Sequence, residues 1–182
     1  MFMDLLVGTV ISLFVGAAGV VMMQTNYIAG AAISGQNNVN AVTRVQMDSL
    51  ADSLRNAQIG PTQTAVTAAS ISDITFNIDS AGDTARYWLN TTVSPAQLMR
   101  AQTNSGVTAT AKVVGTGVTS LQFTYYPSGG WATTLSPNYP STSELPTISA
   151  VGITVQMTIN GYTSTLVSLV RLRNSPYVSP SP

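Results

Sequence analysis

The chain has 182 residues and a net charge of zero, with 7 basic and 7 acidic side chains. Charged residues make up 8% of the sequence, about a third of the usual share in a soluble protein. Without a broad basic face, general nucleic-acid binding is not expected. The chain has neither His nor Cys, the side chains on which acid–base, thiol and transition-metal chemistry usually depend. We therefore expect no enzyme activity, no metal and no cofactor.

The first feature in chain order is an uncharged segment that follows a lone acid, Asp4. No charged residue occurs in 5–43, and the apolar stretch 5–23 is long enough to cross a bilayer, since about 20 helical residues span ~30 Å of hydrocarbon. Signal peptides and ordinary anchors carry flanking positive charges, but this chain has none before Arg44. A simple anchor remains the alternative. A carboxylate at the start of an apolar helix suggests instead that this carboxylate has a dedicated partner.

The helical pattern resumes after a polar stretch, 24–40, and ends before Gly60-Pro61, which a helix cannot pass. The sequence predicts ion pairs on this second half between Arg44 and Asp48 and between Asp52 and Arg55. The apolar residues of this half fall at helical spacing on a single face: Met47, Leu50, Ala51 and Leu54. We expect one N-terminal helical segment over 1–58, followed by a globular domain over 59–182.

Glycines recur along the helical segment, at Gly8, Gly16, Gly19, Gly30 and Gly35. Each costs about 1 kcal/mol of helix stability relative to Ala. Small residues also let two helices approach closely. We interpret the segment as a helix that packs against copies of itself and can unwind near Gly16 and Gly19 or near Gly30 and Gly35. A slightly weak membrane helix is the alternative interpretation.

Beyond residue 61 the apolar residues alternate with polar ones, as in strands. The clearest strand covers 151–159, and Asn160-Gly161 then predicts a type I′ hairpin turn with a return strand over 163–173. We expect a single antiparallel sheet whose apolar face is covered by the stripe on the helix. The stretch 126–146 is rich in Pro, Ser and Gly and predicts a long exposed loop.

Two carboxylates in this domain, Asp79 and Asp83, flank a glycine and form a candidate ion site. Calcium takes six to eight oxygen ligands, and two carboxylates supply few of them. Asp and Gly are also the residues that a turn between strands requires. A turn is the simpler interpretation, and the ion remains the alternative.

Several segments together resemble type IV pilins and pseudopilins. They are an N-terminal acid followed by Leu5, Leu6 and Val7, an uncharged helix, an amphipathic continuation that ends in LRNAQ (54–58), and a sheet. The downstream runs ITFNID (74–79), GVTSLQFTYY (117–126) and VRLRN (170–174) are most similar to W/J-type minor pilins. The resemblance implies an α+β type IV pilin fold, in which a long N-terminal α-helix packs on a C-terminal antiparallel β-sheet.

The resemblance also implies how such a chain is processed and assembled. A prepilin peptidase cleaves the precursor, the new first residue is methylated, and an inner-membrane machine transfers the subunit from the membrane into an extracellular helical filament of the same or other pilins. Assembly would then rest on Met1, Asp4, Leu5, Leu6 and Val7, with Asp4 facing a neighbouring N-terminal amine. The family's acid lies at the fifth mature position and is usually Glu, whereas here it is Asp at position 4. We expect a processed chain that lacks its leader.

The family includes subunits with different tasks. Surface pili serve adhesion, twitching motility or DNA uptake, and either major or minor subunits are compatible with this sequence. One alternative is a pseudopilin of a type II secretion system. Another, from a different class, is a membrane-anchored surface binding domain that never polymerises.

Overall fold

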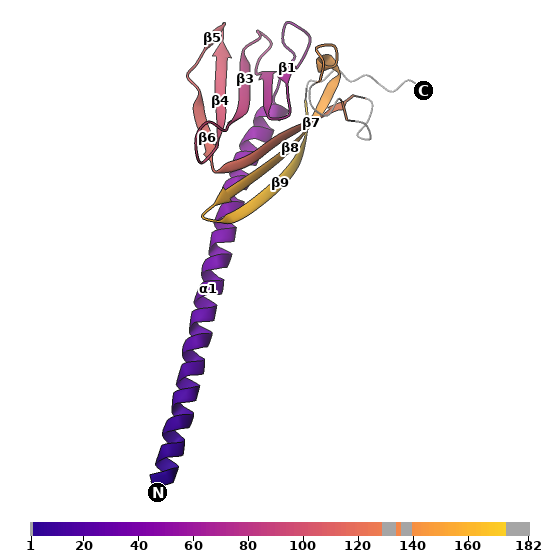
Figure 1. The fold of residues 1–182 in the computed structure, drawn as a ribbon. Coiled ribbons are helices and arrows are strands. Elements are labelled where there is room, and N and C mark those ends of the chain that lie inside the picture. Colours follow the sequence, from indigo (N-terminus) through magenta and orange to yellow (C-terminus); the bar gives the residue numbers. More distant parts are fainter. Residues whose placement is uncertain (1, 129–133, 136–139, 174–182) are drawn as a thin grey trace, which may run out of the picture. The chain divides into compact units, whose positions relative to one another are not determined.

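The structure, a computed structural model, describes residues 2–128, 134–135 and 140–173, without the side chains of Asp4 and Leu5. It begins with one continuous helix, α1 (Phe2–Arg55), of 54 residues (Figure 1). The chain forms two compact units, 1–38 and 39–182, and α1 contributes to both. The helix ends slightly earlier than expected, before Gly60-Pro61.

The second unit contains two antiparallel sheets. The strands of sheet A are β1 (Val66–Ala69), β2 (Asp73–Asn77), β3 (Thr84–Asn90), β4 (Gln97–Asn104), β5 (Val107–Thr108) and β6 (Lys112–Thr116). Those of sheet B are β7 (Val118–Pro127), β8 (Ile148–Ile159) and β9 (Tyr162–Arg171), with a short 3₁₀ helix, η1 (Leu145–Thr147), before β8. Sheet A has the strand order β1-β2-β3-β4-β5, and β6 also pairs with β4. Sheet B has the order β7-β8-β9.

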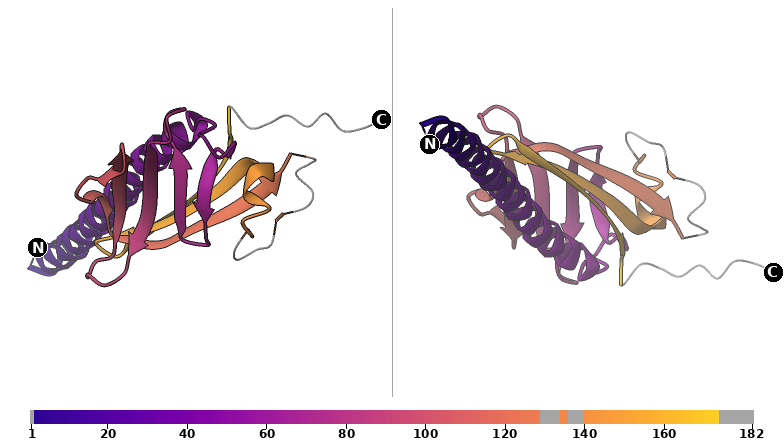
Figure 2. Two further views of the ribbon diagram at one scale, coloured as in Figure 1. Left: turned by 90° about the horizontal axis from the view of Figure 1, so that it is seen from above. Right: turned by 90° about the horizontal axis from the view of Figure 1, so that it is seen from below.

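The expectation of a single sheet is wrong, and the chain changes sheet at one glycine. The pairing of β6 with β4 stops at Thr116, and Gly117 follows with a φ of +80°. A Cβ at Gly117 would lie 2.9 Å from the carbonyl oxygen of Thr158, so only glycine fits this close approach. Sheet B therefore starts in a new direction, and its strands run at an angle to those of sheet A (Figure 2).

The predicted apolar stripe on the second half of α1 is confirmed. Its four residues are at most 4% exposed and join one core cluster with side chains from both sheets: Met47, Leu50, Ala51 and Leu54. Of the two predicted ion pairs, Asp52 with Arg55 forms, whereas the exposed Arg44 and Asp48 do not pair. The fold is thus of the α+β class, with a long N-terminal helix packed on antiparallel sheets through its second half.

Polar contacts fix α1 against sheet A, which lies across it (Figure 2). The hydroxyls of Ser53 on α1 and Tyr87 on β3 are 3.0 Å apart, and the Tyr87 ring stacks on Phe76 with centroids 6.0 Å apart. Gly115 on β6 faces the side chain of Gln46, where an added Cβ would lie 2.0 Å from the amide oxygen. A side chain at Gly115 would require Gln46 to move, so sheet A and the helix meet closely at this point.

The predicted hairpin turn between β8 and β9 is confirmed. Asn160 and Gly161 have φ values of +52° and +82°, as a type I′ turn requires. In such a two-residue turn the flanking residues, here Ile159 and Tyr162, form a hydrogen-bonded pair. This pair sets the register along the whole β8–β9 ladder.

Asn77, at the end of β2, anchors the segment that follows α1. Its side chain is 2% exposed, and its Nδ2 donates to the carbonyl of Thr64 at 2.7 Å. Its backbone also bonds Gln58 and Ala65. The helix end and sheet A therefore share one hydrogen-bonded junction.

We expect Asn77→Ala to lower the free energy of unfolding by about 1–3 kcal/mol, because it removes a buried hydrogen bond and leaves space beside Gly60. The matched control is Asn104→Ala at an exposed position of β4, where a change within about 0.5 kcal/mol is expected. Denaturant unfolding of the full chain in detergent measures both. Equal destabilisation by the two variants would contradict the junction.

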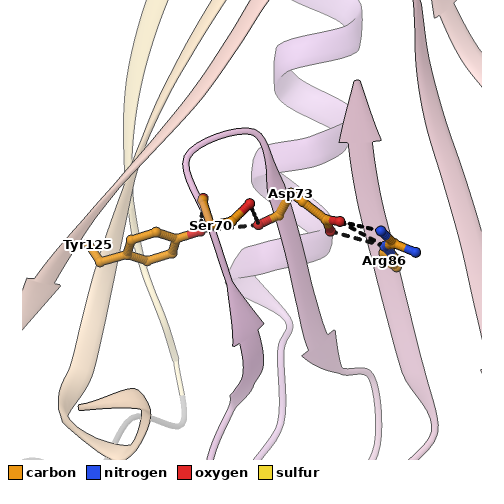
Figure 3. Close-up of polar contacts among 4 residues, drawn as sticks. All are labelled: Ser70, Asp73, Arg86 and Tyr125. Carbon is orange, nitrogen blue, oxygen red and sulfur yellow. Dashed lines mark hydrogen bonds and ion pairs between the residues drawn. The ribbon is translucent and has the colours of Figure 1, made fainter. Parts of the chain in front are cut away.

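Tyr125 links the two sheets. Its hydroxyl, on β7, donates to the Ser70 carbonyl in the turn between β1 and β2 at 2.7 Å (Figure 3). The same turn leads to Asp73, whose carboxylate forms an ion pair with Arg86 on β3. Tyr125 is 2% exposed, and burial, aided by the negative charge of Asp73, raises the pKa of its phenol above the usual 10. The group that links the two sheets is thus a neutral hydroxyl, which donates a hydrogen bond.

Because the pKa of Tyr125 is higher in the folded chain than in the unfolded one, its contribution to stability is complete below pH 10 and declines as the pH rises toward the folded value. We expect the stability difference between the native chain and Tyr125→Phe to be constant from pH 7 to 9 and to shrink above pH 10. Urea unfolding at each pH measures it. A difference that grows above pH 10 would contradict the assigned burial.

Candidate assembly helix

The first part of α1 exposes an unusual amount of apolar surface. From Phe2 to Met23 the segment is 22 residues long, roughly 33 Å at ~1.5 Å per residue, which matches the hydrocarbon core of a bilayer. The large apolar side chains that the structure describes here are all at least 44% exposed: Phe2, Met3, Leu6, Val7, Val10, Ile11, Leu13, Phe14, Val15, Val20, Val21, Met22 and Met23. Such a surface is stable only when lipid or other protein covers it.

The hydroxyl groups on this part of α1 are satisfied within the helix. Thr9 donates to the carbonyl of Leu6 at 2.9 Å, and Ser12 donates to the carbonyl of Gly8 at 2.8 Å. Thr25 donates in the same way to Val21 at 2.7 Å. With these bonds made locally, the hydroxyls do not require water. The helix can therefore enter an apolar environment without leaving them unpaired.

One side of the helix carries a shallow groove. Gly8, Ser12 and Gly16 follow one another at intervals of four residues and line it, together with Thr9, Leu13, Ala17 and Val20. A Cβ added at Gly8, Gly16, Gly19 or Gly30 would meet no atom within 4 Å. Contacts within the described chain thus do not require these glycines, whereas a second helix could approach closely along them.

The predicted assembly residues all belong to the start of this helix or precede it. Met1 lies outside the described residues, and the side chains of Asp4 and Leu5 also lie outside the description, although their backbone is helical. Leu6 and Val7 are 50% and 55% exposed. The prediction that Asp4 meets a positive group is therefore tested by no contact in this structure and stays a prediction.

The glycines expected to permit unwinding lie in regular helix. α1 is uninterrupted at Gly16, Gly19, Gly30 and Gly35. Local unwinding would be a change from this state, and it remains a prediction. Ser12, which lies with Gly8 and Gly16 along the groove, was not among the residues predicted from the sequence. Its spacing of four from each of these two glycines is visible in the sequence.

The candidate ion site lies in the turn between β2 and β3, and its second carboxylate contacts the turn between β4 and β5. Asp79 Oδ1 accepts hydrogen bonds from the backbone N–H groups of Gly82 at 3.0 Å and Asp83 at 2.9 Å. Asp83 Oδ1 accepts one from Ser105 at 2.7 Å. Among the described residues, no group of three or more His, Cys, Asp or Glu side chains lies close enough to hold a metal ion. Both carboxylates thus hold loops in this structure, and the ion stays a prediction.

The predicted loop 126–146 is described only in part, at 126–128, 134–135 and 140–146. It includes the end of β7 and the start of η1. Glu144 accepts hydrogen bonds from the backbone and hydroxyl of Ser141, which lower the pKa of its carboxyl group. These bonds close a local turn before β8.

By length and composition, α1 is the one helix in the described part of the chain that could cross a membrane. This is compatible with membrane association. A comparison with protein-family models gave no match, and neither the curated proteins nor the solved structures include one that matches this chain.

Proposed function

We propose that this chain is a structural subunit of an extracellular type IV pilus-like filament and that it has the type IV pilin fold. The observation that carries the proposal is the exposed apolar helix over 2–23, which has a single acid near its start and continues into a segment of α1 that is packed on the sheets. One half of α1 already has its partner within the chain. The other half needs partners outside it.

In the proposed filament, the N-terminal helices of many copies form the core. The apolar side chains of one helix cover those of its neighbours, at about 1.5–3 kcal/mol for each side chain removed from water. The groove along Gly8, Ser12 and Gly16 lets a neighbouring helix approach closely. Before assembly the same helix resides in the inner membrane, where lipid covers it.

In this proposal Asp4 sets the axial register between the N-terminal helices of neighbouring subunits. An unpaired carboxylate in an apolar environment costs several kcal/mol. The N-terminal amine of an adjacent subunit cancels that cost only when the two helices are correctly staggered. Since no other charge occurs before Arg44, a wrong stagger leaves both groups unpaired. The partners of the chain are thus other copies or other pilins, the prepilin peptidase and the inner-membrane assembly machinery.

Two further candidates share the exposed helix. A pseudopilin of a type II secretion system would assemble through the same contacts into a short periplasmic filament. A membrane-anchored surface binding domain would keep 2–23 in lipid permanently. The acid near the start of the helix favours an assembling subunit over the anchor.

Shearing of intact cells separates these candidates. Surface filaments released by shearing are examined by electron microscopy and their components quantified by mass spectrometry. The proposal predicts that this chain is a component of the sheared filaments, in bulk for a major pilin or in trace for a minor one. Recovery from membranes alone, with none in the sheared fraction, would contradict it.

A further inference from the structure

The strand β9 forms an open edge of sheet B. It is ten residues long and pairs with β8 without interruption from Tyr162 to Arg171. On its other side, no strand among the described residues pairs with it. A long unpaired edge is a template for another strand.

The backbone groups along this edge are available for pairing. Hydrogen-bonded and non-bonded pairs alternate along an antiparallel ladder, and the pair of Ile159 and Tyr162 beside the turn is bonded. The N–H and C=O groups of Thr165, Val167 and Leu169 therefore point away from β8. No described residue bonds them on that side.

The usual protection of such an edge is missing from β9. Proteins protect edges with charges, prolines, bulges or very short strands. The stretch 163–170 has no charge and no proline, and its register has no bulge. Val167 is 75% and Leu169 51% exposed. By contrast, β1 has four residues and a bulge, and β6 starts with Lys112 and is bulged.

We propose that β9 pairs with β9 of a second copy of this chain, antiparallel and centred on Val167. In this register Val167 faces Val167 of the second copy, and Leu169 faces Thr165. The edge groups of Thr165, Val167 and Leu169 then bond one another across the pair. The two three-stranded sheets become one continuous sheet, and the exposed apolar side chains cover each other.

The charge distribution along β9 favours an identical strand as the partner and an antiparallel direction of pairing. The only charged residue of β9 is Arg171, at one end. Antiparallel pairing places each Arg171 opposite Thr163 and holds the two arginines at opposite ends. A parallel pair in register would set them side by side, which is unfavourable. An uncharged strand centre offers no attraction to a strongly charged partner, and it suits an identical strand.

A single pair of strands buries less than the ~1,000 Å² of a stable interface, so one such contact is weak. Many contacts in a row add through avidity. The twofold axis of an antiparallel strand pair is normal to the sheet, and a twofold axis perpendicular to the filament axis cannot relate subunits that point the same way within one polar filament. In the filament, a consequence that rests on the proposed function, β9 pairs therefore join neighbouring filaments that run in opposite directions.

Single cysteines test the register, because the chain has none of its own. In Val167→Cys the two sulfurs meet across a bonded pair with Cα atoms about 5.5 Å apart, which fits a disulfide. In Thr165→Cys, the matched control, the two cysteines are four residues apart along the pair, about 13 Å. Thr165 lies on the same exposed edge, so chemistry and access are comparable.

The full chain in detergent is oxidised at equal concentration for each variant. We expect disulfide-linked dimers of Val167→Cys to form at least about tenfold faster than those of Thr165→Cys, given the mismatch in distance. A mixture of Thr165→Cys with Leu169→Cys should form mixed disulfide-linked dimers about as fast as Val167→Cys does, although each of the two variants alone forms them slowly. Equal rates for all three variants, or no mixed dimers, would overturn the proposal.

The cross-linking assay in detergent requires no filaments, so it tests the β9 pair even if the proposed function is wrong. Where filaments are present, Val167→Lys should separate bundled filaments and leave their number unchanged. Bundles that persist in Val167→Lys would contradict lateral joining through β9. Loss of filaments from the native chain would count against the proposed function alone.

Discussion

Replacing Asp4 with Ala is expected to remove this chain from surface filaments while leaving its level in the membrane unchanged. The variant leaves the amine of the neighbouring subunit buried without a partner, which costs about 3–5 kcal/mol at each contact. A single contact is then weakened by about 10²-fold or more, and a filament repeats the contact at every subunit. Quantitative mass spectrometry of the sheared and membrane fractions measures the ratio.

Asp4→Glu is the matched control. It keeps the charge and adds one methylene, so we expect filaments to form. Asp4→Asn keeps the shape without the charge and should behave like Asp4→Ala. Normal filaments from both uncharged variants would defeat the pairing mechanism, and loss of the protein from the membrane would indicate misfolding instead.

Leu54→Ala is expected to have the largest effect on the folded domain. Leu54 is fully buried on α1, in the core cluster that joins the helix to both sheets. Truncation of a buried leucine costs the lost burial and the cavity that remains, together about 2–5 kcal/mol. Denaturant unfolding of the full chain in detergent should show a midpoint shifted down by a corresponding amount.

Val45→Ala provides the control on the same helix. Val45 is 69% exposed, so its truncation should change the free energy of unfolding by no more than about 0.5 kcal/mol. Neither substitution lowers the helix propensity, since Ala is the best helix former. Equal effects of the two substitutions would mean that α1 is not packed on the sheets as described.

Local patterns were enough to predict some elements. The spacing of Met47, Leu50 and Leu54 gave the buried face of α1 because only one face of a helix can meet a sheet. The β8–β9 hairpin followed from strict alternation and from Asn160-Gly161. In both cases the determining residues lie within a few positions of one another.

Other elements depend on partners far along the chain. β4 has only a short apolar pair, at 98–99, among residues that are otherwise polar or small, and its pairing is set by β3 and β6. β1, with the sequence VTAA, has little strand character until it pairs with β2. The division into two sheets rests on the backbone at Gly117, and no side-chain pattern reveals it.

The functional surfaces also include one feature that local sequence predicts and one that depends on distant partners. The apolar run and the lone acid can be read directly from the sequence, and the described side chains of 2–23 are exposed, in agreement with the apolar run. The open edge at β9 could not be predicted, because it depends on which strands lie beside it. Val167 and Leu169 look like ordinary strand residues until the order of sheet B is known.

A density map of sheared filaments at side-chain resolution tests the central claim most directly. We predict that the first helices cluster around a common axis and that each Asp4 carboxylate lies within about 4 Å of the N-terminal nitrogen of an adjacent subunit, the distance of an ion pair. Helices splayed apart, with that carboxylate in solvent or facing no positive group, would contradict it.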